Sequence, residues 1–251
     1  MNPTTIKQTR DLMGMTINVE IVDSSAKDTD LDIVFSYFER VEKRFSVFRE
    51  DSEITLLNNK KISKDQLSDE TKTVFALAEE TKSLTNGYFN IVTSEGKYNP
   101  SGIVKGWAIY NASRLLFEKG FKDFYVEAGG DIQAYGLNAL GKKWSVGIQN
   151  PFDLSQIVKV IYLKDKGVAT SGTYRRGQHI YDPHNTGNPL SDIVSISIIG
   201  PNVYEADRFA TAAFAMGGKG INFIEDLDGF EAYMIDRNGI ATQTSGFAVY
   251  L

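Results

Sequence analysis

FYVEAGGDIQAYG, residues 124–136, is the stretch at which the sequence changes from helical to strand patterns. Apolar and polar residues alternate on both sides of Gly129-Gly130, which predicts two strands joined by a glycine bend. Three strand candidates rich in β-branched residues follow, at WSVGIQ (144–149), IVKVIYL (157–163) and DIVSISIIG (192–200). The second half of the chain is therefore predicted to be mainly β-sheet.

Helical spacing dominates the first half of the chain. After an alternating strand at 15–21, apolar residues recur at steps of three and four from Leu31 to Phe48, which predicts an amphipathic helix. Ser68 is a candidate N-cap of a second helix that stops at Thr85-Asn86-Gly87. A third helix is predicted from about 103 to Gly120.

The end of the chain mixes both patterns. We predict a helix over 204–217, a short helix over 221–224, and two strands, EAYMI (231–235) and 240–251, joined by a turn. Helices first and strands later indicate the α+β class. We expect a single two-lobed domain over 1–251, with mostly antiparallel sheets flanked by helices.

Composition removes several classes of function. The net charge of -5 is opposite to that of a nucleic-acid-binding surface, so we expect no nucleic-acid partner. The absence of cysteine excludes disulfides, thiolate metal sites and cysteine nucleophiles. The first 14 residues lack the apolar core of a signal peptide, and we expect no integral membrane segment. We therefore expect a cytoplasmic protein as given, and an exported one if a native export signal precedes this sequence.

Residues 167–187, GVATSGTYRRGQHIYDPHNTG, gather the most varied polar chemistry. They contain both histidines of the chain, a hydroxyl cluster, the arginine pair Arg175-Arg176, and four glycines. Arginine pairs suit phosphate because the planar guanidinium donates two parallel hydrogen bonds. We interpret the stretch as an anion-binding, phosphate-handling loop; the alternative is a polar hairpin of a β-rich protein.

His179 is a candidate general base in this stretch, since histidine titrates near neutral pH. The structural alternative is a histidine that only packs in a strand. A hydrolase triad of Ser171, His179 and Asp182 is conceivable from the residue types. The strained G-x-S-x-G turn that would support such a triad is absent.

Asp207 and Thr211 lie four residues apart on the predicted helix over 204–217, so they share one face. A carboxylate and a hydroxyl that project together from an otherwise apolar helix suit a hard, oxygen-preferring cation such as Mg²⁺. The alternative needs no metal: an acid is favoured in a first helical turn, and a helical threonine can bond to its own backbone.

Lys105 lies beside Gly106 where the third helix is expected to begin. A lysine at a helix N-terminus can meet phosphate through its charge together with free backbone N–H groups. The surrounding GIVKG sequence lacks the glycine spacing of a Walker motif, and no helix follows Gly129-Gly130-Asp131 as a dinucleotide fingerprint would require.

Several of these pieces occur in the order in which the ApbE-type FAD:protein FMN transferases carry them, and the chain resembles that family over 13–217. The matching segments are Met13-Gly14-Met15, Ser52-Glu53 with Leu57-Asn58, Gly87-Tyr88-Phe89-Asn90, Ile103-Val104-Lys105-Gly106-Trp107-Ala108, Gly129-Gly130-Asp131, Ala169-Thr170-Ser171-Gly172 with Tyr174-Arg175, His179-Ile180 with Asp182-Pro183 and Thr186-Gly187, and Ala206-Asp207 with Thr211. The resemblance implies one ApbE-like flavin transferase domain over 1–251.

The resemblance also implies a reaction. FAD and Mg²⁺ would be bound, and FMN would be transferred to a threonine or serine hydroxyl of an acceptor flavoprotein, with release of AMP. The implied metal ligands are Asp207, Thr211 and the main-chain carbonyl of Val104, and the implied catalytic residues are His179 and Asp182. The implied FAD contacts come from Met15, Lys105, Gly106, Gly129, Gly130, Asp131, Thr170, Ser171, Gly172, Tyr174, Arg175, His179 and Ile180.

Three positions depart from the family pattern. Asn90 replaces the usual aspartate, His184-Asn185 replaces an arginine and adds a residue, and Thr173 stands where an acid is common. These changes are compatible with an altered FAD pocket or with hydrolysis of FAD to FMN and AMP. The alternatives are therefore an FAD pyrophosphatase and a non-catalytic FAD-binding protein.

Overall fold

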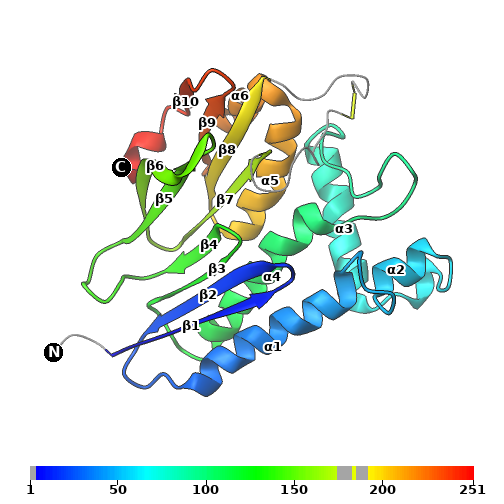
Figure 1. The fold of residues 1–251 in the computed structure, drawn as a ribbon, viewed down its shortest axis with the longest axis horizontal. Coiled ribbons are helices and arrows are strands. Elements are labelled where there is room, and N and C mark those ends of the chain that lie inside the picture. Colours follow the sequence, from blue (N-terminus) through cyan, green and yellow to red (C-terminus); the bar gives the residue numbers. More distant parts are fainter. Residues whose placement is uncertain (1–3, 174–182, 185–191) are drawn as a thin grey trace.

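The computed structural model of this chain describes residues 4–173, 183–184 and 192–251 (Figure 1). Its strands and helices follow one another in this order: β1 (Thr5–Leu12), β2 (Met15–Val22), α1 (Asp28–Phe45), α2 (Glu53–Asn58), η1 (Lys64–Gln66), α3 (Asp69–Leu84), α4 (Ser101–Glu118), β3 (Phe124–Ala128), β4 (Asp131–Tyr135), β5 (Trp144–Asn150), β6 (Asp153–Leu163), β7 (Lys166–Gly172), β8 (Ile193–Gly200), α5 (Val203–Ala215), η2 (Gly217–Lys219), α6 (Gly220–Glu225), β9 (Glu231–Asp236), β10 (Ala241–Gln243) and η3 (Phe247–Tyr250).

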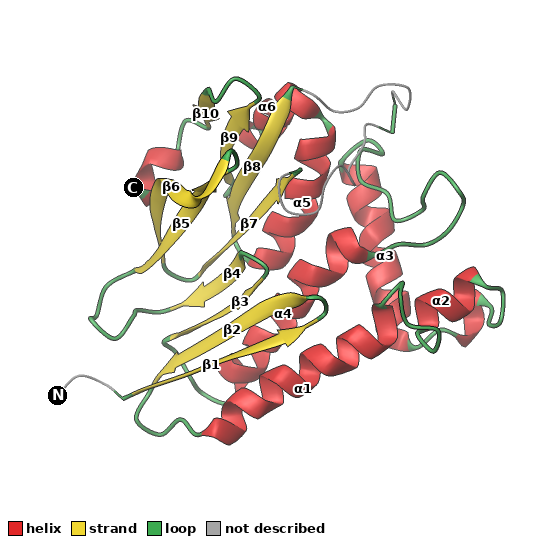
Figure 2. Ribbon diagram, in the orientation of Figure 1, coloured by secondary structure: helices red, strands yellow, loops and turns green. Residues whose placement is uncertain are grey.

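Eight strands form one sheet in the order β1-β2-β3-β4-β7-β8-β9-β10, and β5 and β6 form a separate two-stranded sheet. Every pair of neighbouring strands in the described part of the chain is antiparallel. The predicted α+β class with mostly antiparallel sheets flanked by helices is confirmed (Figure 2).

Helices α1, α4 and α5 cover one face of the large sheet, and α6 packs beside β9 (Figure 2). Strand alternation produces this layer, because every second side chain of a strand points to the same face. Phe124 and Val126 of β3 are fully buried on the helical side, together with Phe35 and Phe38 of α1. The core between sheet and helices fixes the position of α4 and α5, which carry part of the candidate site.

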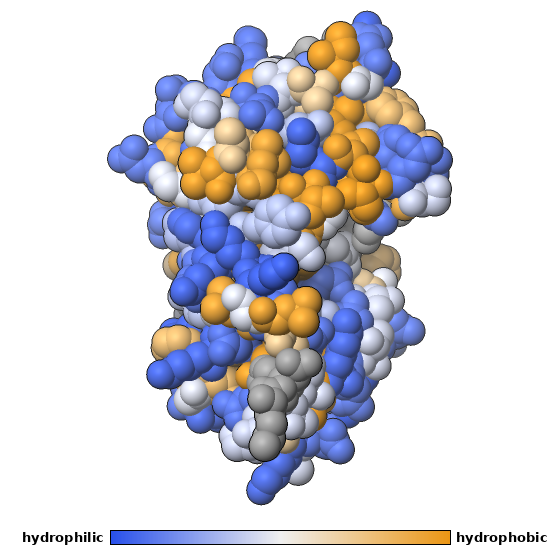
Figure 3. Space-filling view, turned by 90° about the vertical axis from the view of Figure 1, so that its left-hand side faces the viewer, coloured by the Kyte–Doolittle hydropathy of each residue, from blue (hydrophilic) through white to orange (hydrophobic). Residues whose placement is uncertain are grey.

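The β5–β6 hairpin covers the other face of the large sheet. Tyr125 of β3 meets Trp144 of β5 with ring centroids 5.0 Å apart, and Phe247 of η3 is buried nearby against Tyr233. The outward side of β6 remains apolar and exposed at Val160 and other residues, and Figure 3 shows apolar residues gathered in the upper half of that side of the molecule. In the described part of the chain, no helix has the length and apolar character needed to cross a membrane.

The first predicted helix is present as α1 but ends earlier than expected. Its apolar positions at three- and four-residue steps are buried up to Phe45. The prediction that Phe48 continues this stripe was wrong, because Phe48 is 93% exposed. The chain turns away at Ser46, whose backbone is extended and whose carbonyl accepts the Ser52 hydroxyl that caps α2.

Two strands were missing from the sequence prediction, and one was too long. β1 has no buried apolar face, and all of β7 except Lys166 lies in the stretch interpreted as a phosphate loop. The predicted strand over 240–251 is a strand only as β10. The Thr244 hydroxyl bonds to Glu231, Ser245 bonds to Glu225, and the chain then coils into η3. Side-chain hydrogen bonds of this kind compete with strand pairing.

Candidate active site

Three segments that are distant in sequence meet around the Lys105 side chain. Its ammonium nitrogen lies 2.5 Å from Oδ2 of Asp131, at the start of β4, and 3.3 Å from Oδ1 of Asp207, on α5. The Asp131 and Asp207 side chains are only 1% and 4% exposed. Buried carboxylates are costly unless they are paired, so this lysine is the cation that keeps the two of them in the interior.

Helices α4 and α5 approach very closely at Gly106. The Gly106 backbone N–H donates a 2.7 Å hydrogen bond to Oδ2 of Asp207. A Cβ atom at Gly106 would lie 2.5 Å from Cβ of Asp207 and 2.8 Å from the Val203 carbonyl oxygen. Only glycine fits at this crossing, because any side chain would force the two helices apart.

The Asp207 carboxyl has an unusual environment. Burial raises its pKa, and the nearby Asp131 carboxylate raises it further, while the Lys105 ammonium and the Gly106 N–H oppose the rise. Asp207 is the fifth residue of α5, and the acid of the first turn is Glu205. The alternative explanation of Asp207 as a first-turn acid is therefore wrong, because its contacts lie across the helix crossing. Perturbed carboxyls of this kind gather at functional sites.

Thr211 lies one helical turn beyond Asp207 and faces the start of α4. Its hydroxyl is 3.4 Å from the Gly102 carbonyl oxygen, which is a long and weak hydrogen bond. Gly106 is the ordinary helical donor to that carbonyl, yet its N–H also points to Asp207. The main-chain oxygen beside the Thr211 hydroxyl is that of Gly102, and the expectation that the Val104 carbonyl is a metal ligand stays a prediction.

The Gly129-Gly130 turn presents Asp131 to Lys105. Both glycines have positive φ, +61° and +98°, which other residues rarely adopt. Glu127 Oε1 accepts a 2.6 Å hydrogen bond from the Gly130 N–H, and the Met15 sulfur lies only 3.2 Å from the point where a Cβ of Gly129 would be. The turn is thus held from both sides.

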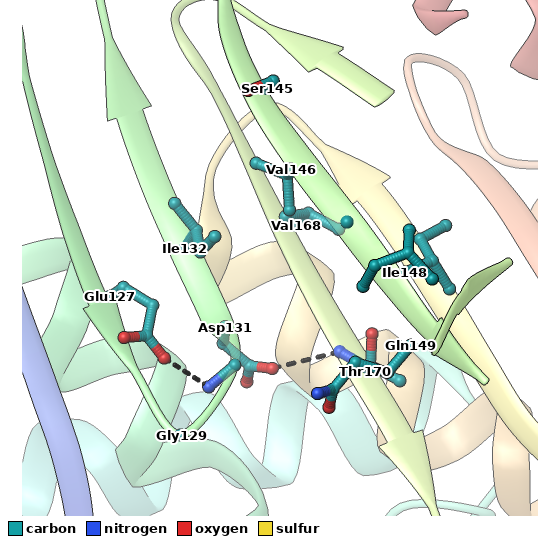
Figure 4. A pocket seen from close by; sticks show the side chains of 13 residues that line it. Glu127, Gly129, Asp131, Ile132, Ser145, Val146, Ile148, Gln149, Val168 and Thr170 are labelled. Carbon is teal, nitrogen blue, oxygen red and sulfur yellow. Dashed lines mark hydrogen bonds between the residues drawn. The ribbon is translucent and has the colours of Figure 1, made fainter. Parts of the chain in front are cut away.

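A pocket of about 320 Å³ opens beside this turn, between the large sheet and the β5–β6 hairpin (Figure 4). Figure 4 shows Val146 and Ile148 of β5 facing Ile132 and Val168 of the sheet. The polar side chains at the lower end of the pocket in Figure 4 are those of Glu127, Asp131, Gln149 and Thr170. A cleft with one apolar wall and a few converging polar groups is a common form of small-molecule site.

Strand β7 brings the predicted hydroxyl cluster to the same place. The Thr170 N–H donates to Oδ1 of Asp131 at 3.0 Å, and the Thr170 hydroxyl is 2.7 Å from that of Ser197 (Figure 4). Ser171 is buried, and Gly172 ends the strand. The site residues predicted at Tyr174, Arg175, His179, Ile180 and Asp182 lie outside the described residues.

Two of the three departures from the family pattern have described side-chain contacts. The Asn90 side-chain oxygen accepts the Val92 N–H, so this residue shapes its own turn. His184 Nε2 lies 2.9 Å from the Asn86 carbonyl oxygen, and the imidazole meets the Tyr88 ring edge-on. His184 therefore contacts the turn that follows α3.

Sequence reasoning missed Glu127, Gly102 and Arg208. Glu127 lies two residues before Gly129-Gly130, and that closeness was the available signal for it. Arg208 is 5% exposed and binds Glu205 at 2.6 Å and the Thr81 hydroxyl at 3.1 Å, which ties α5 to α3. The available signal for Arg208 was its position next to Asp207 on an otherwise apolar helix. A buried arginine is nearly always paired, so a partner could have been expected.

Relatives with curated names match parts of the chain. The FAD:protein FMN transferase of Escherichia coli (strain K12) is 31% identical in an alignment of 154 positions that covers 57% of this chain and 44% of that protein. The FAD:protein FMN transferase of Vibrio cholerae serotype O1 is 27% identical in an alignment of 269 positions that covers 82% of this chain and 79% of that protein. The chain thus spans less than half of the length of the Escherichia coli relative.

Solved structures share the fold over nearly the whole chain. The flavin transferase ApbE from Vibrio cholerae superposes with a TM-score of 0.86 at 24% identity, covering 99% of this chain and 100% of that one. The ApbE protein from Thermotoga maritima gives a TM-score of 0.88 at 21% identity, covering 98% and 99%. The model of the ApbE family matches residues 13–97 and 93–234, and this chain therefore belongs to the ApbE family.

Proposed function

We propose that this protein transfers FMN from FAD to a threonine or serine hydroxyl of an acceptor protein and releases AMP. The observation that carries the proposal is the buried Lys105–Asp131–Asp207 cluster, which adjoins the pocket through Asp131. Relatives named FAD:protein FMN transferase support the same reaction. Such a transfer needs positioning and charge neutralisation more than covalent catalysis.

The proposed step breaks one phosphoanhydride bond. The acceptor oxygen attacks the phosphorus of the FMN half of FAD, the bond from that phosphorus to the bridging oxygen breaks, and AMP leaves with the bridging oxygen. The hydroxyl proton goes to His179, in the role that the family resemblance gives it, and Asp182 is the second catalytic residue that the resemblance implies. The phosphates would lie near Lys105, which carries the positive charge of the cluster.

The residues around Asp207 fit Mg²⁺, which the proposal requires. The donors are oxygen atoms only: the Asp207 carboxylate, the Thr211 hydroxyl with its weak hydrogen bond, and the Gly102 carbonyl. In the described part of the chain, no three His, Cys, Asp or Glu side chains cluster, so water and substrate phosphates would complete the shell. Bound there, Mg²⁺ would neutralise charge that develops on the phosphate oxygens.

Mass spectrometry with FAD, Mg²⁺ and a threonine-containing acceptor peptide tests the proposal. Peptide that gains the mass of FMN, together with released AMP, is the expected result. FMN and AMP formed at the same rate without peptide would instead establish an FAD pyrophosphatase. FAD that stays intact while bound would establish a carrier without chemistry.

The metal assignment is tested with Asp207→Ala. We expect this variant to lose Mg²⁺-dependent turnover, because the only carboxylate of the proposed ligand set is gone. The matched control is Asp228→Ala, since Asp228 is exposed and outside the cluster. Normal Mg²⁺-dependent turnover by Asp207→Ala would show that the metal is held elsewhere.

A further inference from the structure

Both carboxylate oxygens of Asp207 already have partners in the described structure. Oδ2 accepts the Gly106 N–H at 2.7 Å, and Oδ1 faces the Lys105 ammonium at 3.3 Å. A main-chain N–H of a packed helix cannot move away without separating α4 from α5. A lysine ammonium sits on a flexible four-carbon stem and can move. Oδ1 is therefore the atom that a metal cation can reach, and the Lys105 ammonium occupies the position beside it.

Charge makes the two cations compete. The described cluster has two carboxylates and one ammonium, all with side chains at most 15% exposed. Charges buried within a few ångströms of one another interact strongly because the surroundings are poorly polarisable. A divalent ion at Oδ1 with the ammonium still in contact would place two cations against the same oxygen.

Asp131 offers the ammonium another position. Oδ2 of Asp131 is 2.5 Å from the Lys105 nitrogen, and apart from that ion pair it has no hydrogen-bond partner among residues 4–173, 183–184 and 192–251. The ammonium can therefore keep Asp131 when it leaves Asp207. The movement required is small, since both carboxylates are in contact with the same nitrogen.

We propose that Lys105 is the resident counterion of Asp207, and that a divalent cation binds Asp207 by displacing the Lys105 ammonium toward Asp131. The inference rests on the proposed function, because that function places the cation at Asp207. Lys105 then sets the cation affinity of the free protein. It stays paired with Asp207 until a metal ion arrives.

Mn²⁺ binding to the protein without FAD, followed by electron paramagnetic resonance at pH 8.0, tests the exchange. Lys105→Met removes the competing charge, so we expect Mn²⁺ to bind about tenfold more tightly than to the wild type. Lys119→Met is the matched control, because Lys119 pairs with a buried carboxylate, Asp30, at 2.8 Å. Equal or weaker Mn²⁺ binding by a folded Lys105→Met would overturn the exchange.

The wild-type protein provides a second test that does not depend on the folding of Lys105→Met. Lysine ammonium resonances are observed by ¹H–¹⁵N NMR, and Lys105 is assigned by its loss in Lys105→Arg. We expect the Lys105 signal to shift on saturation with Mg²⁺ while the Lys119 signal stays in place. A Lys105 signal that does not change on saturation would refute the exchange.

The two tests separate this inference from the proposed function. A wild-type protein that binds no Mn²⁺, with or without FAD, would remove the metal from the proposed function and the exchange with it. Wild-type binding that Lys105→Met does not strengthen would remove the exchange alone. FMN transfer to the peptide acceptor would then still stand on its own assay.

Discussion

The close approach of α4 and α5 at Gly106 gives a quantitative prediction for Gly106→Ala. The new Cβ would lie 2.5 Å from Cβ of Asp207, and inserting atoms into a packed crossing costs about 1–3 kcal/mol. Separating the helices also weakens the 2.7 Å hydrogen bond to the Asp207 carboxylate, worth about 1.5–3 kcal/mol. Alanine returns about 1 kcal/mol of helix propensity.

These terms together predict a loss of about 3 kcal/mol in the free energy of unfolding. For a chain of this size that corresponds to a melting temperature about 6–12 °C lower, measurable by calorimetry or by urea denaturation. The matched control is Gly102→Ala on the same helix, where the nearest atoms to a Cβ lie at 3.3 and 3.4 Å and can adjust. Gly102→Ala should change the melting temperature little. A Gly106→Ala protein as stable as the wild type would refute the close crossing.

Three further predictions concern residues around the site and the fold. Glu127→Ala removes the acceptor of the Gly130 N–H and should weaken FAD binding roughly tenfold by calorimetric titration, whereas Glu127→Gln retains an acceptor. Arg208→Met should cost about 2 kcal/mol in urea denaturation, less than a fully buried pair because Glu80 is half exposed. The hydrogen bond from Lys119 lowers the pKa of Asp30 below its ordinary value. The ion pair therefore stabilises the folded protein above the ordinary carboxyl pKa, and this stabilisation is lost as pH falls through the lowered pKa. Lys119→Met should show a smaller loss of unfolding free energy on acidification.

Local patterns predicted the elements whose apolar faces are buried. The α1 stripe, the Ser68 cap of α3 and the two strands around Gly129-Gly130 follow from spacing and capping chemistry. β1 was missed because its residues alternate between exposed and half-buried positions without an apolar face. Phe48 was misplaced because the end of α1 is set by hydrogen bonds to Ser46 from a later segment, which no local pattern reports.

The residue types of the site could be predicted from the sequence. The crossing of α4 and α5 that brings them together could not. Lys105, Asp131 and Asp207 each carried a local signal, yet nothing in their spacing says that they share one ion-pair cluster. That cluster depends on a helix crossing that is permitted by the missing side chain of Gly106. Gly106 beside Lys105 was interpreted as part of a phosphate-binding helix start. In the structure, its main effect is that the missing side chain lets α4 and α5 approach closely.

The order of strands in the large sheet supplies the rest of the site. That order depends on β5 and β6, which do not join the large sheet. Both have the apolar alternation of ordinary strands, yet they leave the large sheet and fold over it as a hairpin. β4 consequently pairs with β7, and this pairing brings the Thr170 N–H to the Asp131 carboxylate. The displaced hairpin becomes the opposite wall of the pocket. The alternation of apolar residues shows which face of a strand is buried, but not which strand lies beside it. The separation of β5 and β6 from the large sheet therefore could not be predicted, and it creates both the polar end and the apolar wall of the pocket.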